Sequence, residues 1–304
     1  MAKSKGSQNV TGGDYGSHDY IRYLRAYHAL IMPACLSAIE ALGMPAGSRI
    51  LDAGCGCGNS LPLIHGALDG QCEIVGVDNS EIMLSGAREV VKDQSLGNTT
   101  LLRANLLESL PLSDDEFDFV WVSDVMHPSS DFDHVRALGE LTRVLKPGGT
   151  LAIFHSSWLR PLYLPGHTYL EHALGRAREC LYSREEKEPG ILWHGANHPE
   201  RALDWLMDIG LVSCDVSFHT ALHQQPLAPT VRGFLEYRLK SVYQKSVAAH
   251  GREVGMTDDD LQHWKELSDP TDSSYILDQA SYYCALFALV SRGVKPLLSQ
   301  QEDN

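Results

Sequence analysis

Residues 49–58 read RILDAGCGCG, and this stretch decides the fold. The apolar run that ends in an acid is typical of a buried strand, and the glycines after it indicate a tight turn. Gly54, Gly56 and Gly58 alternate with other residues, and glycine both adopts positive φ angles and lets a ligand approach the backbone. Residues 59–68 then have the pattern of a short helix with an Asn or Ser cap. The sequence therefore predicts a strand, a glycine loop and a helix, with room for a ligand at the loop.

The same alternation of strand and helix patterns continues to residue 157. It predicts a parallel sheet that is covered by helices on both faces. In such a sheet ligands bind outside the carboxyl ends of the strands, so polar residues at those ends are candidate site residues. The expected strands are 49–54, 72–78, 99–105, 117–124 and 150–157, and the expected helices between them are 59–68, 80–93 and 133–145.

The flanking segments have other patterns. A helical pattern over 18–43 contains Pro33, which we expect to split or kink the helix. An amphipathic helix over 198–211 leads into a strand. Residues 281–293 are expected to form the last strand, with inward-facing side chains at Tyr282, Tyr283, Phe287 and Val290.

These patterns predict one domain over residues 14–304 rather than two independent ones. It would consist of N-terminal helices at 14–44, a ligand-binding core at 45–157, and two helical insertions at 160–197 and 226–275 that form a lid. Residues 1–13 are expected to be a disordered tail, because their Gly, Ser, Lys and Asn residues bury too little apolar surface to offset the ordering entropy.

The composition narrows the class of partner. The 304 residues include 25 Lys and Arg against 39 Asp and Glu, a formal net charge of −14, which gives no broad attraction to nucleic acid or anionic lipid. No apolar run is long enough to cross a bilayer, and the polar N-terminus does not look like a secretory signal. The 7 cysteines are an odd number in a long chain, which favours reduced thiols. We therefore expect a cytoplasmic protein that acts on a small molecule.

Two acids flank the glycine loop, and they help to choose between two cofactors. Asp52 ends the first strand, and Asp78 ends the second, where a carboxylate can accept hydrogen bonds from ribose hydroxyls. A nicotinamide dinucleotide needs wider glycine spacing so that a helix N-terminus can hold its pyrophosphate, and Asp52 would place negative charge near that anion. S-adenosylmethionine carries an ammonium and a sulfonium and has no phosphate, so it suits the acid better.

Four motifs in order resemble those of the class I S-adenosylmethionine-dependent methyltransferases, of the branch that acts on small molecules. They are DAGCGCG at 52–58, VD at 77–78, FDFV at 117–120 and LKPGG at 145–149. The resemblance is strong over about 45–157 and extends by general layout to 198–222 and 281–293. It implies a Rossmann-like, mostly parallel sheet of seven strands, with the last strand antiparallel beside the fifth. It also implies S-adenosylmethionine as the cofactor and S-adenosylhomocysteine as the product. Cys55 and Cys57 have no second Cys or His pair at zinc spacing, so no metal is expected and the two cysteines are interpreted as small loop fillers.

The resemblance implies a role for each matching residue. Asp52 would bind the amino end of the methionine part, the glycines would shape the turn beneath it, and Asp78 would bind the ribose. Where the family commonly has an acid facing the adenine amine, this sequence has Asn105, whose side-chain oxygen can still accept a hydrogen bond. From the N-terminal helices, Tyr15, Tyr20 or Tyr27 would close over the cofactor. The expected cofactor-binding residues are Tyr27, Asp52, Ala53, Gly54, Gly56, Gly58, Asp78, Asn79, Ile82, Asn105, Leu106 and Ser123.

Histidines supply the candidate bases. Methyl transfer to a hydroxyl requires removal of a proton, and a histidine near neutral pKa suits that task. His127, in the VMHPSSD segment that is similar to a segment of small-molecule O-methyltransferases, is the first candidate, although histidines there also serve as pocket wall. His155, after the fifth strand, is the second, with Ser156 as an assisting group.

The predicted activity is O-methylation of a small molecule in natural-product metabolism. N- or C-methylation, a methyltransferase fold that binds the cofactor without transferring methyl, and a nicotinamide dehydrogenase stay open as alternatives. Aromatic residues in 160–197 suit a flat substrate but also suit a helical core of their own. The helix near 231–245 could close the site or form a homodimer contact.

Overall fold

The computed structural model describes residues 17–126, 133–156, 161–184 and 198–297. The chain divides into two compact units, each built from three stretches of sequence. The sheet unit comprises Ala34–Ser156, Gly190–His219 and Ala288–Asn304, and the helical unit comprises Met1–Pro33, Ser157–Pro189 and Thr220–Phe287. The limits of the single domain and of its lid insertions stay a prediction, and the expected disordered tail lies outside the described residues.

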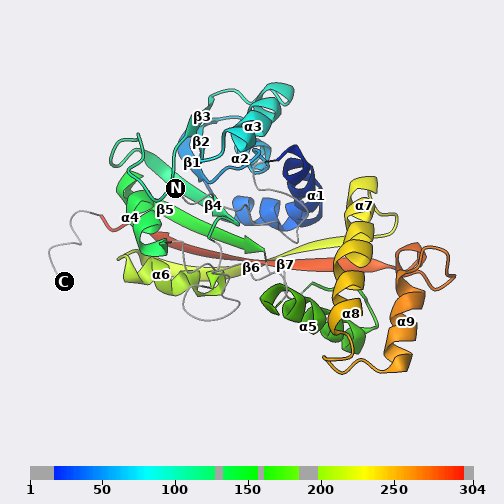
Figure 1. The fold of residues 1–304 in the computed structure, drawn as a ribbon. Helices are drawn as coiled ribbons and strands as arrows, with labels where there is room; N and C mark the ends of the chain where they lie inside the picture. The colour runs from blue at the N-terminus through cyan, green and yellow to red at the C-terminus, as the bar shows by residue number, and fades with distance from the viewer. Residues whose placement is uncertain (1–16, 127–132, 157–160, 185–197, 298–304) are drawn as a thin grey trace, which may run out of the picture. The chain divides into compact units, whose positions relative to one another are not determined.

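The described strands form a seven-stranded sheet in the order β3-β2-β1-β4-β5-β7-β6 (Figure 1). Strands β1 to β5 pair in parallel, and β7 pairs antiparallel with β5, from Thr150↔Val294 to Ser156↔Ala288. The predicted Rossmann-like sheet and its antiparallel last strand are confirmed. The strands are β1 Ser48–Ala53, β2 Cys72–Asp78, β3 Thr99–Arg103, β4 Phe117–Ser123, β5 Leu145–Ser156, β6 Val212–Gln224 and β7 Tyr283–Val294.

Helices α3 and α4 of the sheet unit begin at capping side chains that the sequence already displays. Ser80 accepts a hydrogen bond from the Met83 backbone N–H at the start of α3 (Glu81–Asp93), and Asp133 does the same for Arg136 at the start of α4 (His134–Val144). The other helices are α2 (Leu61–Ala67), the short η1 (Pro199–Arg201) and α6 (Ala202–Asp208). The capping hydrogen bond expected for the helix at 59–68 is wrong, because the side chain of Ser60 makes no such bond.

One face of the sheet packs against α4 and α6 in a common apolar core. Leu51, Val77 and Val122 of the strands lie in the same buried cluster as Leu138 and Leu206 of these helices. Side chains alternate along a strand, so Trp121 points the other way, and its indole N–H donates to the Ser60 hydroxyl just before α2 at 3.4 Å. Helices therefore cover both faces, and the carboxyl ends of the parallel strands are left for the loops.

Several local predictions need correction. The helix α1 runs unbroken over His18–Ala41 with Pro33 inside it, so the expected split is wrong. Strand β5 begins at Leu145 rather than residue 150, because the KPGG segment continues the strand. Tyr283 and Phe287 are exposed rather than inward-facing, since strand alternation places them opposite Val290, which is buried.

The helical unit is built around packed helices and the ends of β6 and β7. Its helices are the first part of α1, α5 (Thr168–Arg184), α7 (Pro229–Tyr237), α8 (Gln244–His250), α9 (Asp258–Ser268) and the short η3 (Ile276–Asp278). A π-helical segment, η2 (Arg238–Tyr243), joins α7 to α8. Helix α5 packs on α8, and the indole of Trp264 in α9 donates to the Gln244 side chain at 3.0 Å. Among the described residues, no helix combines the length and apolarity needed to span a membrane.

Candidate functional site

The glycine loop after β1 is held against β2 by its own backbone. The N–H groups of Gly54 and Cys55 both donate to the carbonyl of Val77, at 2.7 and 2.9 Å. All three glycines have positive φ, of 79° at Gly54, 53° at Gly56 and 83° at Gly58. A Cβ on Gly54 would lie 2.4 Å from Val125 Cγ2, whereas a Cβ on Gly56 would meet nothing within 4 Å. The middle glycine thus exposes backbone to open space, where a ligand can approach it.

Asp78 ties the loop to the end of β2. One carboxylate oxygen accepts the Gly56 N–H at 2.9 Å, and the other accepts the Ser80 N–H at 2.8 Å. Each oxygen retains a lone pair for a further donor such as a ribose hydroxyl. Burial raises the pKa of this carboxyl, and the backbone donors partly oppose that rise. The cap of α3 is Ser80, so Asp78 is not needed as a helix cap.

Asp52 is a buried carboxyl beneath the loop. Its residue is 1% exposed, and its Oδ2 has no hydrogen-bond partner among the described residues. Burial, and then the nearby charge of Asp78, raise its pKa to about 7. A buried carboxylate without a partner is costly, and a ligand cation placed beside it would offset that cost. The buried Asp52 carboxyl therefore suits a cationic ligand and disfavours an anionic pyrophosphate.

A second polar cluster lies at the carboxyl ends of β4 and β5. Asp124 follows β4 with φ of 51°, and its carboxylate accepts the Ser156 N–H at 2.8 Å and the Ser156 hydroxyl at 2.7 Å. The His155 Nδ1 lies 3.6 Å from the same carboxylate. Burial would raise the pKa of Asp124, but the contacts with His155 and Ser156 outweigh it and hold that pKa below its usual range. The cluster joins an anionic carboxylate to an imidazole.

Residues 50–149 match the family model described as a methyltransferase domain. The chain carries a class I methyltransferase domain. A relative named demethylmenaquinone methyltransferase, from Bacillus cereus (strain AH187), is 38% identical over 156 residues, which are 50% of this chain and 63% of the relative. This chain therefore covers less than two thirds of that relative's length.

Solved structures support the fold of the methyltransferase domain. The phosphoethanolamine N-methyltransferase 2 of Haemonchus contortus, in complex with phosphomonomethylethanolamine and S-adenosylhomocysteine, has a TM-score of 0.52 and 18% identity, and the match covers 93% of this chain and 59% of that one. The same enzyme in complex with S-adenosyl-L-methionine has a TM-score of 0.50 and 18% identity, over 92% of this chain and 58% of that one. At this identity the likeness concerns the fold alone.

Four other predicted site residues of the methyltransferase domain lie at the ends of β1 and β4 or at the start of α3. Ala53 is buried at the end of β1, and Ser123 ends β4, where it pairs with Phe154. Asn79 and Ile82 are exposed at the start of α3, and the Asn79 carbonyl accepts from Arg103 Nε at 3.1 Å. An exposed isoleucine beside the loop is available to an apolar ligand surface.

The predicted adenine-facing pair follows β3, which ends at Arg103 rather than at residue 105. The Asn105 side-chain oxygen accepts the Leu107 N–H at 3.1 Å, and its amide donates to Glu108 at 3.3 Å. Leu106 is buried in the core of the methyltransferase domain. The geometry thus gives Asn105 a turn-forming role in addition to any role toward a ligand.

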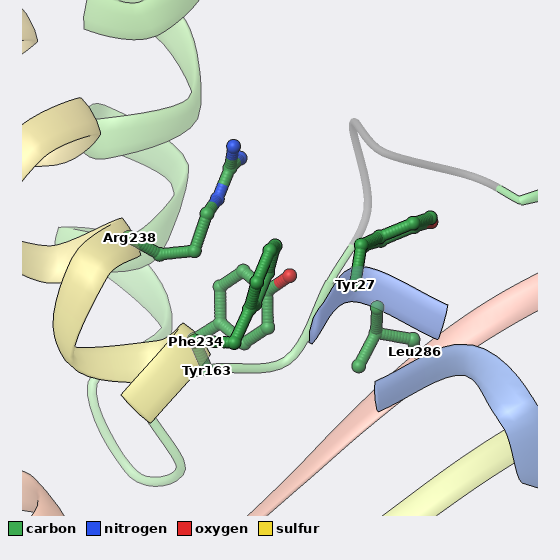
Figure 2. A pocket seen from close by; sticks show the side chains of 5 residues that line it. All are labelled: Tyr27, Tyr163, Phe234, Arg238 and Leu286. Atoms are coloured by element: carbon green, nitrogen blue, oxygen red, sulfur yellow. The ribbon is translucent and has the colours of Figure 1, made fainter. Parts of the chain in front are cut away.

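Two further predicted residues do not belong to the described part of the sheet unit. Tyr27 belongs to the helical unit, where it lines a pocket (Figure 2). His127, the first candidate base, lies outside the described residues, as does Tyr15. Asp124 lies at the carboxyl end of β4, directly after Ser123, within the strand-end stretch 123–127 that the sequence marks for candidate residues. The sequence predicted no specific role for it.

Cys55 and Cys57 act as packing residues. Both are buried and neither forms a disulfide with a described residue, and Cys55 Sγ lies 3.0 Å from where a Cβ on Gly76 would stand. Burial raises the pKa of the Cys55 thiol, with the charges of Asp52 and Asp78 adding to the rise. Among the described residues, no three His, Cys, Asp or Glu side chains are grouped to hold a metal ion.

We expect Gly54→Ala to destabilise the methyltransferase domain by about 2–4 kcal/mol, because the new methyl meets Val125 at 2.4 Å and the positive φ is strained. Thermal and urea unfolding measure the loss. Gly139→Ala in α4 is the matched control, since a Cβ there meets nothing within 4 Å and alanine favours helix. Equal stability of the two variants would show that the loop tolerates a side chain at residue 54.

Proposed function

We propose that this protein transfers a methyl group from S-adenosylmethionine to an oxygen atom of a small organic molecule. The observation that carries the proposal is the buried Oδ2 of Asp52, which has no hydrogen-bond partner among the described residues and lies beneath a glycine loop whose middle residue faces open space. S-adenosylmethionine, when bound, supplies an electrophilic methyl group on a sulfonium. Its ammonium would pair with the Asp52 carboxylate, and its ribose hydroxyls would donate hydrogen bonds to the Asp78 carboxylate.

Two carboxyl groups of the sheet unit, those of Asp52 and Asp124, lie near the same buried side chain, and their negative charge supports a cationic cofactor. That side chain is the thiol of Cys35. Its pKa is raised first by burial and then by the charges of Asp124 and Asp52. A dinucleotide would bring its pyrophosphate toward these acids, so the dehydrogenase alternative is disfavoured.

A small-molecule acceptor is the class that several observations favour. The chain has a net charge of −14, which does not suit nucleic acid, and the relative from Bacillus cereus is named for demethylmenaquinone. The His155–Asp124 pair supports oxygen as the methylated atom, because a hydroxyl must lose a proton whereas a neutral amine need not. We place the reaction in natural-product metabolism in the cytoplasm.

We expect S-adenosylhomocysteine to bind the protein and raise its melting temperature, whereas NADH will do neither. Asp78→Asn should weaken binding of S-adenosylhomocysteine roughly tenfold to a hundredfold, since it removes charge-assisted hydrogen bonds. Isothermal titration calorimetry measures both effects. Asp93→Asn, an exposed acid at the end of α3, is the matched control and should bind as the wild type does.

The outcomes separate the alternatives. Absence of binding by the wild type, or binding of NADH instead, would contradict the proposed cofactor. Binding without methyl transfer to any acceptor in a mass-spectrometric screen of phenols, amines and carbon acids would identify a protein that binds the cofactor without transferring methyl. Methylation of amines or carbon acids alone would overturn the choice of oxygen.

A further inference from the structure

The backbone of His155 is fixed on both sides, but Asp124 holds its ring only loosely. His155 lies in β5, where it pairs with Leu289 of β7, and the next residue, Ser156, donates its N–H and its hydroxyl to the Asp124 carboxylate. The His155 Nδ1 lies 3.6 Å from that carboxylate, which is longer than the roughly 2.7–3.2 Å of a normal N–H···O hydrogen bond. Asp124 attracts the imidazole by its charge, but a contact of this length does not fix the plane of the ring.

A second imidazole packs against the same ring. The ring centroid of His198 lies 5.7 Å from that of His155, and the two ring planes are at 88° to each other. Aromatic side chains favour such edge-to-face pairs at about 4.5–7 Å between centroids. Both residues belong to the sheet unit. The His155 imidazole is therefore restrained by a carboxylate at one nitrogen and by a perpendicular ring.

His198 is itself held in place by the chain around it. Its Nδ1 accepts the Glu200 backbone N–H at 3.2 Å, and this bond makes His198 the N-cap of η1. The next residue, Pro199, is buried, and a proline in the first turn presets the helical φ angle. Helix α6 follows directly, and its Ala202 and Leu206 are buried in the apolar core against the sheet. A short, rigid path thus connects the His198 ring to the core, which is what a positioning group requires.

The capping hydrogen bond also decides which role His198 can have. A ring nitrogen that accepts a backbone N–H has its lone pair engaged, and in the neutral imidazole the proton then lies on Nε2. Neither nitrogen can take a proton from a substrate while this bond is intact. His198 is therefore not a second base, and its effect on a reaction has to pass through His155.

We propose that His198 is a positioning residue, whose ring sets the plane of the His155 imidazole so that its Nε2 faces a hydroxyl of the methyl acceptor. This proposal rests on the proposed function. The two rings lie near the carboxyl end of β5, at the edge of the sheet where ligands of parallel sheets bind. Because the geometry of a reacting pair has a steep effect on rate, a loosely held base loses turnover even where the substrate still binds.

Two substitutions at residue 198 separate its ring from its cap. His198→Asn removes the ring and keeps an N-cap, because asparagine is among the best capping residues. It should lower kcat about five- to tenfold and leave KM and the affinity for S-adenosylhomocysteine unchanged. His198→Phe keeps a ring and removes the cap, so it should unfold at a lower urea concentration while its kcat stays within about twofold of the wild type.

The rates are measured with an acceptor found in the mass-spectrometric screen. His18→Asn, at an exposed histidine at the start of α1, is the matched control and should have wild-type kcat. Wild-type kcat in His198→Asn, or an equal loss of kcat in folded His198→Phe, overturns the proposal.

NMR of isotope-labelled histidine rings tests the contact without turnover. The ring signals of His155, identified by their loss in His155→Ala, should be sharp and of one tautomer in the wild type and in His198→Phe. They should be broadened or averaged in His198→Asn. Unchanged His155 signals in His198→Asn overturn the proposal even if His198→Phe does not fold. Failure of the wild type to bind S-adenosylhomocysteine or to methylate any acceptor overturns the proposed function instead, and the ring spectra still decide whether His198 orders His155.

Discussion

Replacing His155 with alanine is expected to lower turnover at least about a hundredfold while leaving the affinity for S-adenosylhomocysteine unchanged. The Nδ1 atom of His155 faces the Asp124 carboxylate at 3.6 Å, so Nε2 is the ring nitrogen left to accept a proton from a substrate hydroxyl. The Ser156 backbone N–H and hydroxyl fix that carboxylate at 2.8 and 2.7 Å. Because the pKa of Asp124 is held below its usual range, Asp124 stays ionised where histidine titrates.

Asp124 is a positioning residue in this scheme, and Asp124→Asn tests it. We expect lower kcat with little change in KM, since the amide keeps the shape but no longer holds Nδ1–H with a charge. The rates would be measured with an acceptor found in the screen. His18→Ala, an exposed histidine at the start of α1, is the control. Near-normal turnover of His155→Ala would contradict the scheme, and a hundredfold loss in His127→Ala would then assign the base to His127.

The parts of the site that the sequence predicts are those encoded locally. A strand, alternating glycines and an acid at the next strand end occupy neighbouring stretches, so Gly54, Gly56 and Asp78 could be found from spacing alone. The expected helix start at Ser80 was confirmed for the same reason, because a cap bonds only three residues ahead.

The parts that the sequence does not predict depend on long-range pairing. Asp124 contacts Ser156 because β4 and β5 are neighbouring strands in which Ser123 pairs with Phe154. The positive φ of Asp124 turns the chain out of the sheet directly after that pair. The π-helical segment Arg238–Tyr243 is likewise not predicted, because regular helical spacing continues through it in the sequence. The pocket that Tyr27 lines gathers side chains as distant in sequence as Tyr27 and Leu286.

The second large expected effect is that the affinity for the cofactor depends on pH through the Asp52 carboxyl. Its pKa of about 7 means that the carboxyl is mostly protonated below neutral pH, and a cationic ligand must displace that proton to bind. The affinity for S-adenosylhomocysteine, whose ammonium is the cation, should therefore rise up to about tenfold per pH unit from pH 5.5 to 7 and then level off. Asp52→Asn should bind at least about tenfold more weakly at pH 8 and show no such rise. Calorimetry across this pH range measures both.

The unliganded stability should move in the opposite direction to the affinity, which separates a ligand role for Asp52 from a structural one. Because folding raises the pKa of Asp52 from 3.8 to about 7, the folded state binds more protons than the unfolded state between these values. Stability of the wild type therefore falls as pH rises through that window, and Asp52→Asn, which carries no buried charge, should unfold at a higher urea concentration at pH 8. A residue kept for stability would make the variant weaker instead. An asparagine variant that is less stable at pH 8, or that binds S-adenosylhomocysteine with the wild-type pH profile, would show that the Asp52 carboxylate does not face the ligand cation.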